Sequence, residues 1–154
     1  MRFAERTDYA LRALMFLAAH PGRHAVPAMS PRIGVSSNHL TKVVQALQHL
    51  GWVNTSRGRG GGVELAIDPN ALTAGDVVRA IEPDMALVEC FRAGNACPLD
   101  NRCQLKHALR DASEAFLSVL DSVSLAELSP EWQDPLHAVT LQSTAQARKL
   151  HPDA

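Results

Sequence analysis

A glycine-rich turn with two arginines, placed between two short β-prone runs, constrains the fold of this chain more than any other segment. The turn covers residues 56–62 and contains Arg57 and Arg59 among four glycines. The flanking runs, 52–55 and 63–67, are expected to pair as a hairpin, because glycine allows the positive φ angles of a tight turn. Arginine supplies charge and a forked set of donors that suit phosphate or a narrow minor groove. The pattern predicts a basic β-hairpin of the kind that forms a wing on DNA-binding domains.

A predicted pair of helices directly precedes this hairpin. Residues 27–33 favour only a short helical piece, because Pro31 lacks an N–H donor and is tolerated in a first turn alone. Gly34 then turns the chain, and residues 38–50 predict a strong helix that ends at Gly51. The apolar residues of this helix recur at helical spacing and form one stripe, which consists of Leu40, Val43, Val44, Leu47 and Leu50. A short helix, a turn and a capped second helix make the helix-turn-helix arrangement.

The first turn of the second helix holds the residues expected to meet DNA. Ser36 or Ser37 is expected to cap this helix, and both are expected to touch phosphate. Asn38, His39 and Lys42 would face outward, where such a helix presents its N-terminal turn to the major groove. Polar residues also line the outer face of ordinary surface helices. The basic hairpin that follows favours the DNA-binding interpretation over this ordinary one.

Two further helices are predicted on either side of this motif. Apolar residues recur at helical spacing after Thr7, which is the expected N-cap. The predicted helix ends before Pro21 and Gly22. Thr73 and Asp76 are spaced as a capping-box variant that opens a helix over residues 74–82. We therefore expect a mainly α chain with a small β-hairpin wing.

A long helix is predicted in the second half of the chain, over residues 104–123. Its apolar stripe consists of Leu105, Ala108, Leu109, Ala112, Phe116, Val119, Leu120 and Val123. Internal burial would cover this stripe, but a long C-terminal helix in a small DNA-binding protein usually packs against its copy in a dimer. Ser124 and Glu127 predict a capping box for a short helix through Leu128, and residues 129–154 are expected to be irregular.

Charge and composition narrow the class of protein. Residues 1–62 hold eight Lys or Arg against two acidic residues, a net charge of +6, whereas the remainder has a net charge of −7. A basic first part is expected where a chain meets a polyanion. A length of 154 residues with 46% hydrophobic content fits one globular domain, and no apolar run is long enough for a membrane span. We expect a cytoplasmic protein that is not an enzyme, because neither a signal peptide nor a nucleophile–base pair is visible.

Three cysteines, Cys90, Cys97 and Cys103, lie within one window and none lies elsewhere. An odd, clustered set in a reducing compartment argues for a metal or redox site rather than for disulfides. On spacing alone, zinc, an iron–sulfur cluster and simple reactive thiols all remain open. Zinc sites and iron–sulfur clusters generally have four protein ligands. The candidates for a fourth ligand are His107, Asp8 and Asp100.

Several motifs together resemble the winged-helix regulator family of IscR and NsrR. They are TDYALR at 7–12, SNHLTKVV at 37–44, RGRGGG at 57–62 and GDVVR at 75–79. The residues around the cysteines and the segment 115–121 resemble the nitric-oxide-sensing members in particular. The resemblance extends over about residues 1–128.

The resemblance implies a homodimeric repressor with three functional regions. They are a winged-helix DNA-binding region at 1–82, a cysteine loop at 83–103 and a dimerisation helix with a short following helix at 104–128. Nitric oxide would attack the cluster, lower the affinity for DNA and derepress genes of nitric-oxide detoxification. The operator would be a palindrome read by Asn38, His39 and Lys42 in the major groove and by Arg57 and Arg59 from the wing.

The resemblance also implies the ligands of an iron–sulfur cluster. A 4Fe-4S cluster would be held by Cys90, Cys97 and Cys103, with Asp8 from the other subunit as the fourth ligand. The alternative is a 2Fe-2S cluster with His107, in a regulator of iron–sulfur homeostasis or redox stress. Arg12 is a candidate for a phosphate contact, although a salt bridge with Asp8 at i,i+4 explains it equally well.

Overall fold

The part of the chain that the structure describes is mainly helical, and its two strands form one antiparallel hairpin. The computed structural model describes residues 3–99 and 102–129. Its elements are α1 (Glu5–Ala19), α2 (Val26–Ile33), α3 (Ser37–His49), β1 (Val53–Ser56), β2 (Gly62–Leu65), α4 (Ala74–Ile81), the 3-10 turn η1 (Glu89–Phe91), α5 (Gln104–Asp121) and α6 (Leu125–Leu128). The expected irregular segment 129–154 lies, except for Ser129, outside the described residues.

The helix-turn-helix motif forms as the sequence predicts. Gly34 ends α2 in the left-handed conformation with φ at 69°, and the side chain of Ser36 caps α3 by accepting a hydrogen bond from the backbone N–H of His39. Gly51 follows the last residues of α3 with φ at 76°. Each of these positions favours glycine or a residue with a short acceptor, so local sequence determines the end of α2 and both ends of α3.

Two local predictions are wrong. Pro31 lies inside α2 and not in its first turn. The helix tolerates it because α2 has only eight residues and the Pro31 ring is exposed. Thr7 is not the N-cap of α1, since Ala4 occupies that position without a side-chain hydrogen bond. Thr7 is instead fully buried, and its hydroxyl is used in a long-range contact with the end of α4.

The hairpin is an antiparallel pair that is fastened to the helices. Val53 pairs with Leu65 and Ser56 with Gly62. His24, in the connection between α1 and α2, exchanges two backbone hydrogen bonds with Val63 of β2. A Cβ at Gly62 would lie 2.5 Å from the carbonyl oxygen of His24, so only glycine permits this close approach. The base of the wing is thereby fixed against the helix-turn-helix.

One apolar core holds α1, α2, α3, the hairpin, α4 and α6 together. Its largest fully buried side chains include Phe16, Leu14, Leu17, Met29, Ile33, Leu40, Leu47, Ile81 and Leu125. The capping boxes predicted at the starts of α4 and α6 are both present. Leu125 of α6 packs in the core and also donates a backbone hydrogen bond of 2.8 Å to Leu72.

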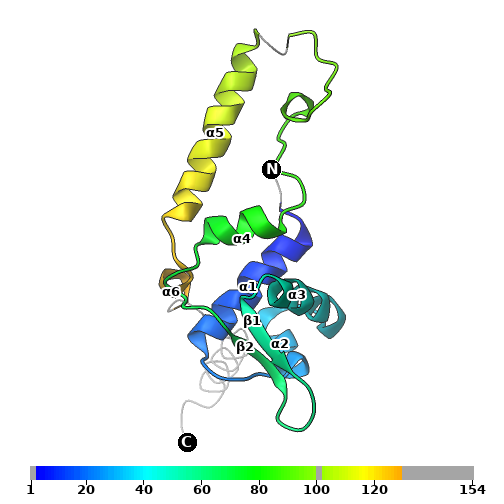
Figure 1. Ribbon diagram of the computed structural model, residues 1–154, viewed down its shortest axis with the longest axis vertical. Coiled ribbons are helices and arrows are strands. Elements are labelled where there is room, and N and C mark those ends of the chain that lie inside the picture. The colour runs from blue at the N-terminus through cyan, green and yellow to red at the C-terminus, as the bar shows by residue number, and fades with distance from the viewer. Residues whose placement is uncertain (1–2, 100–101, 130–154) are drawn as a thin grey trace, which may run out of the picture.

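Helix α5 stands apart from this core (Figure 1). Its C-terminal end is attached to the core, because Asp121 is paired with Arg79 of α4 at 2.6 Å and Val123 accepts a backbone hydrogen bond from Ala74. From there the helix extends away, and no residue within α5 is buried. Leu105 and Val119 are each 64% exposed, so the single chain leaves the predicted apolar stripe largely uncovered.

Candidate functional site

The first turn of α3 presents the polar side chains predicted to read DNA. Asn38, His39 and Lys42, together termed the reading turn, are exposed, as the helical spacing indicates. Ser36 caps the helix, whereas Ser37 does not cap it: the Ser37 hydroxyl is hydrogen-bonded to that of Ser30 in α2 at 2.9 Å. This bond joins the two helices of the motif. A phosphate contact by either serine remains a prediction.

Both arginines of the wing are exposed in the turn between β1 and β2. Gly58 and Gly60 alternate with them and have φ angles of 90° and 79°, which residues with a side chain would adopt only with strain. Figure 1 shows the hairpin at the end of the molecule away from the N-terminal end of α5. Arg57 and Arg59 are therefore placed on a protruding basic turn close in sequence to α3.

Asp8 and Arg12 form an ion pair on the exposed face of α1. The guanidinium of Arg12 donates to both carboxylate oxygens of Asp8, at 3.1 Å and 2.6 Å, and each side chain is 44% exposed. A Cβ at Gly34 would lie 3.8 Å from Nη1 of Arg12, so this pair reaches the turn between α2 and α3. The i,i+4 salt bridge is therefore present, and the phosphate contact of Arg12 remains a prediction.

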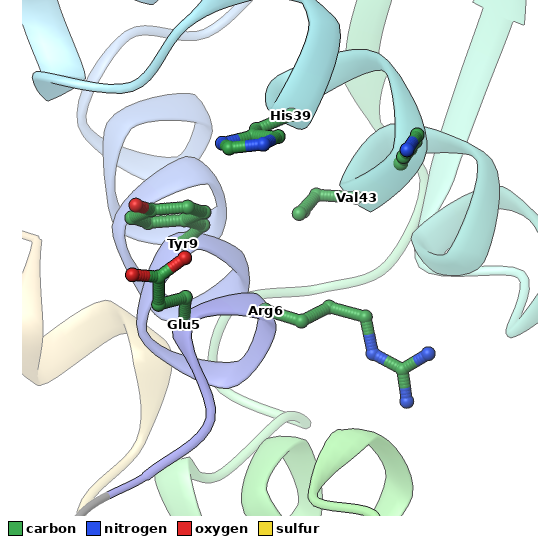
Figure 2. Close-up of a pocket in the computed structure, with 6 residues that line it drawn as sticks. Glu5, Arg6, Tyr9, His39 and Val43 are labelled. Carbon is green, nitrogen blue, oxygen red and sulfur yellow. The ribbon is translucent and has the colours of Figure 1, made fainter.

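Two aromatic rings meet where α1 crosses α3. The phenol ring of Tyr9 and the imidazole of His39 are stacked, with centroids 6.0 Å apart and planes inclined by 21°. A hollow of about 170 Å³ lies beside them, lined by Glu5, Arg6, Tyr9, His39, Lys42 and Val43. Figure 2 shows the two rings facing each other, whereas Arg6 points away from them. The Arg6 guanidinium donates instead to the carbonyl of Ile81 at 2.8 Å.

The end of α4 is bound to the start of α1 through Glu82. One carboxylate oxygen of Glu82 accepts from the Thr7 hydroxyl at 2.7 Å and from the backbone N–H of Ala4 at 3.1 Å. A carboxylate at a helix N-terminus also interacts favourably with the helix dipole. Glu82 thus supplies the charge and the acceptor that the N-cap residue Ala4 lacks.

The cysteine loop follows Glu82 directly and contains three free thiols. Cys90 lies in η1, and Cys90, Cys97 and Cys103 are all partly buried. Asp84 and Arg92 are paired near the start of the loop, and the backbone N–H of Cys97 donates to Oδ1 of Asn95 at 3.1 Å. The N–H of Ala86 and then the Arg92 guanidinium hold the pKa of Asp84 below its ordinary value.

An open hollow of about 610 Å³ borders the first cysteine. It is lined by residues 90–95 of the loop and by Lys106 and Arg110 of α5. Two cationic residues of α5 therefore border the same depression as Cys90. His107, the alternative ligand, is exposed in the first turn of α5 and its backbone N–H points to the Cys103 carbonyl at 3.4 Å.

The donor types of this loop fit an iron–sulfur cluster better than an oxygen-preferring ion, since thiolates are soft ligands and all three are free. The described part of one chain does not gather them into a finished site. Within residues 3–99 and 102–129, no three His, Cys, Asp or Glu side chains form a group that could hold a metal ion. Asp8 is paired with Arg12, and Asp100 lies outside the described residues.

Sequence reasoning missed the functional interest of Tyr9 and Glu82. Tyr9 occurs within an amphipathic helix, where an aromatic side chain is ordinarily a core residue. Glu82 follows the α4 pattern immediately before Pro83. Each contact joins residues far apart in the chain, and no local spacing signals it.

Comparison with known proteins decides the family. The family model Rrf2, described as iron-dependent transcriptional regulator, matches residues 3–131. The chain belongs to the Rrf2 family. It is 44% identical over 137 residues to the helix-turn-helix-type transcriptional regulator NsrR of Bacillus subtilis (strain 168), which covers 87% of this chain and 94% of that relative. The NsrR regulator of Geobacillus kaustophilus is also 44% identical, over 83% of this chain and 89% of its own length.

Solved structures of Rrf2-type regulators share the fold. CymR, the global cysteine regulator of B. subtilis, has a TM-score of 0.65 at 27% identity, and the match covers 84% of this chain and 97% of that chain. IscR of T. potens has a TM-score of 0.69 at 23% identity, covering 86% and 89%. These matches confirm the predicted winged-helix fold.

Two further predictions concern enzymatic activity and membrane spans. The Rrf2 relatives are named as transcriptional regulators and not as enzymes, which agrees with the prediction for this chain. Among the helices of the described residues, none combines the length and apolar character needed to cross a bilayer.

Proposed function

We propose that this Rrf2-family protein is a dimeric transcriptional repressor whose affinity for a palindromic operator depends on an iron–sulfur cluster and falls on exposure to nitric oxide. The observation that carries the proposal is the placement of three free, partly buried thiols on one loop. This loop directly follows the winged-helix elements and precedes the exposed helix α5. The similarity to the NsrR regulators supports the same conclusion.

Cys90, Cys97 and Cys103 would hold the cluster, with 4Fe-4S as the proposed type. Three protein thiolates leave one iron to be completed by another ligand. When bound, the cluster supplies an iron atom whose weakest ligand is open to replacement by nitric oxide. Lys106 and Arg110, which border the Cys90 hollow, would favour a cluster of net negative charge.

Asp8 of the partner subunit is the proposed fourth ligand. A carboxylate is a harder ligand than thiolate and holds iron less tightly, which suits the position at which a small molecule enters. In the described chain both oxygens of Asp8 accept from Arg12. Use of Asp8 as a ligand therefore requires that it give up at least part of this ion pair, which alters how Arg12 lies next to the turn of the helix-turn-helix.

A second copy of the chain would cover α5. The helix leaves Leu105 and Val119 each 64% exposed, and none of its residues is buried. Two such helices packed together would bury both apolar stripes. This arrangement would also bring the cysteine loop of one subunit close to its partner, as the ligand role of Asp8 demands.

Coupling between the loop and the operator would pass through α1. Glu82, at the start of the loop, holds the N-terminus of α1, and α1 packs on α3. Loss of the cluster would free the loop and the partner's Asp8, and so change the spacing of the two recognition helices. A palindrome with half-sites about one helical turn apart is sensitive to this spacing.

A second candidate is a regulator of iron–sulfur homeostasis or redox stress with a 2Fe-2S cluster. The sequence spacing supports it, because His107 follows Cys103 by four residues and lies in the first turn of α5. Imidazole replaces thiolate in some iron–sulfur centres. The two candidates differ in the cluster and in the fourth ligand.

Native mass spectrometry of anaerobically purified protein, before and after stepwise addition of nitric oxide, tests the proposal. It counts iron, sulfide and subunits together. We expect a dimer with one 4Fe-4S cluster per chain, loss of the cluster mass with nitric oxide, and a parallel loss of operator binding in a fluorescence anisotropy titration.

Matched variants separate the two candidates. Asp8→Ala should speed the reaction with nitric oxide or lower cluster occupancy, whereas His107→Ala should leave both unchanged. Asp111→Ala, which removes a carboxylate from α5, serves as the control. A dimer with 2Fe-2S that depends on His107, or operator binding that nitric oxide leaves unchanged, would overturn the proposal.

A further inference from the structure

We propose that Tyr9 is a positioning residue for sequence recognition: its ring orients the His39 imidazole toward the bases and thereby determines the preference of the reading turn. The inference rests on the DNA-binding part of the proposed function and is independent of the cluster and of nitric oxide. Tyr9 lies on α1, outside the helix-turn-helix, so its role in base recognition would be indirect.

The backbone of His39 is fixed at the start of α3. Its N–H donates to the Ser36 hydroxyl, which caps the helix. His39 is exposed, and an exposed side chain in a first helical turn ordinarily exchanges between rotamers. A cap alone therefore places the Cα of His39 but leaves the direction of its ring undetermined.

The stack with Tyr9 supplies the missing constraint. The two rings are inclined by only 21° with centroids 6.0 Å apart, and Tyr9 itself is half-buried. Tyr9 is therefore the anchored member of the pair and His39 the presented one. Parallel, offset aromatic contacts of this kind are favourable by a factor of up to about ten in population.

Ring order matters for recognition because both imidazole nitrogens can take part in hydrogen bonds to base edges. A side chain that is ordered before binding loses less conformational entropy when it meets DNA. It also discriminates better, since a freely rotating ring can reach more than one base edge.

The hollow beside the stack widens the role of Tyr9. His39 and Lys42 both line it, so two residues of the reading turn border the same hollow as Tyr9. Arg6, which also lines the hollow, donates to the Ile81 carbonyl and points away from the rings (Figure 2). A smaller side chain at position 9 would enlarge the hollow and release His39.

Selection from a randomised DNA duplex pool, with anaerobically purified dimer, tests the inference. The proteins compared are the wild type, Tyr9→Phe, Tyr9→Leu, His39→Ala and the double variant Tyr9→Leu/His39→Ala. Dissociation constants are then measured for the selected duplex and for a scrambled duplex at one salt concentration. Circular dichroism and the oligomeric state monitor folding, and Tyr9→Met is a second non-aromatic variant with a different packing volume.

The expected result is a loss of base preference at the positions that His39→Ala also affects. Tyr9→Leu and Tyr9→Met should lower the ratio of specific to scrambled affinity by about tenfold, with little change in scrambled binding. Tyr9→Phe, which keeps the ring, should behave as the wild type, and the double variant should be no worse than His39→Ala. A purely structural role would instead lower both affinities and the melting temperature without changing the preferred bases.

Three outcomes would overturn the inference. They are an unchanged preference in Tyr9→Leu and Tyr9→Met, additive effects in the double variant, or a Tyr9→Phe protein as impaired as Tyr9→Leu. Selection of no sequence by the wild type would overturn the proposed function together with the inference. Selection by the wild type with unchanged preference in the variants would overturn the inference alone.

Discussion

The hydroxyl of Thr7 donates a 2.7 Å hydrogen bond to the carboxylate of Glu82, 75 residues later in the chain. Thr7 is fully buried, and the same carboxylate accepts from the N–H of Ala4. One acidic side chain at the end of α4 therefore completes the N-terminus of α1. The cysteine loop begins at the next residue, Pro83. Glu82 therefore joins the start of this loop to the N-terminus of α1, the helix that packs on the recognition helix α3.

Glu82→Ala is expected to lower the free energy of unfolding by about 2 kcal/mol, because a buried hydroxyl and a backbone N–H both lose a charged acceptor. Thr7→Val, which keeps the shape of the side chain, removes one of these bonds and should cost less. The measurement is urea unfolding at a fixed protein concentration, since a dimer's apparent stability depends on concentration.

Glu64→Ala is the matched control for Glu82→Ala. Glu64 pairs with Arg23 on the surface, where ion pairs contribute about 0 to 1 kcal/mol. The Thr7→Val/Glu82→Ala double variant should be less destabilised than the sum of the two single variants. Equal effects of Glu82→Ala and Glu64→Ala would show that Glu82 acts only as a surface charge.

Features that depend on neighbours within three or four residues were predictable from the sequence. The cap at Ser36, the turn at Gly34 and the capping box from Thr73 to Asp76 each need only a short acceptor or a glycine at the right spacing. The outward direction of Asn38 and Lys42 follows from the apolar stripe on the opposite face of α3. These signals sufficed for the winged-helix fold.

Contacts made by the fold were not predictable in this way. Arg79 and Asp121 are 42 residues apart, and their pairing depends on the angle at which α4 meets α5. The stack of Tyr9 on His39 depends on the crossing of α1 and α3. Thr7 failed as a predicted cap for the same reason, because the acceptor from Glu82 is distant in sequence. Closure of the cysteine site involves a second chain in the proposed dimer, which no spacing in one chain can specify.

The pairing of Asp121 with Arg79 predicts a pH-dependent attachment of α5. The Arg79 hydrogen bond holds the pKa of Asp121 below its ordinary value of 3.8, against a smaller effect of desolvation. The pair therefore stabilises the fold above the unfolded-state pKa, and this contribution is lost as the pH falls through the lower folded-state value. Asp121→Asn should lower the melting temperature slightly at pH 7, and its difference from the wild type should vanish at the acid end of a pH series.

The double-mutant cycle with Arg79→Ala isolates this pair. In an Arg79→Ala background, Asp121→Asn should no longer produce a pH-dependent difference. A Cβ at Gly75 would collide with the Asp121 carboxylate, so Gly75→Ala should displace Asp121 and reproduce the Asp121→Asn profile. A pH dependence that persists without Arg79 would assign the effect to another carboxyl group.

Because the apolar stripe of α5 is exposed in the single chain, a charged residue introduced into this stripe is expected to prevent dimer formation. Val119→Asp should give a monomer in sedimentation velocity at micromolar concentration, since pairing would bury an unpaired carboxylate, at a cost of several kcal/mol. The monomer should retain its helical content, because Val119 is already 64% exposed in the single chain. Ser118→Asp adds the same charge one position away, at an exposed residue outside the apolar stripe. This variant protein should remain a dimer. A dimeric Val119→Asp protein would place the interface elsewhere.

The wing predicts a measurable electrostatic share of DNA binding. Arg57 and Arg59 are exposed on a turn in which Gly58 and Gly60 have positive φ angles, so their side chains are able to approach phosphate. Replacing both by Ala should weaken operator binding and lower the slope of log affinity against log salt by up to about two for each subunit, because each arginine that neutralises a phosphate adds about one to the slope. Binding is measured by anisotropy over a series of salt concentrations with the same selected duplex.

The double variant Arg148→Ala/Lys149→Ala controls for the change in net charge, because it removes two cations outside the predicted DNA-binding region at 1–82 and outside the cysteine loop. Its slope should equal that of the wild type. If the wing variant binds the selected and the scrambled duplex more weakly by the same factor, Arg57 and Arg59 of the wild type contact phosphate alone. A larger effect on the selected duplex than on a scrambled one would indicate that the wing also reads the shape of the minor groove, because arginine prefers a narrow groove. An unchanged slope would remove the wing from the DNA interface and leave the contacts predicted for the helix-turn-helix and for Arg12.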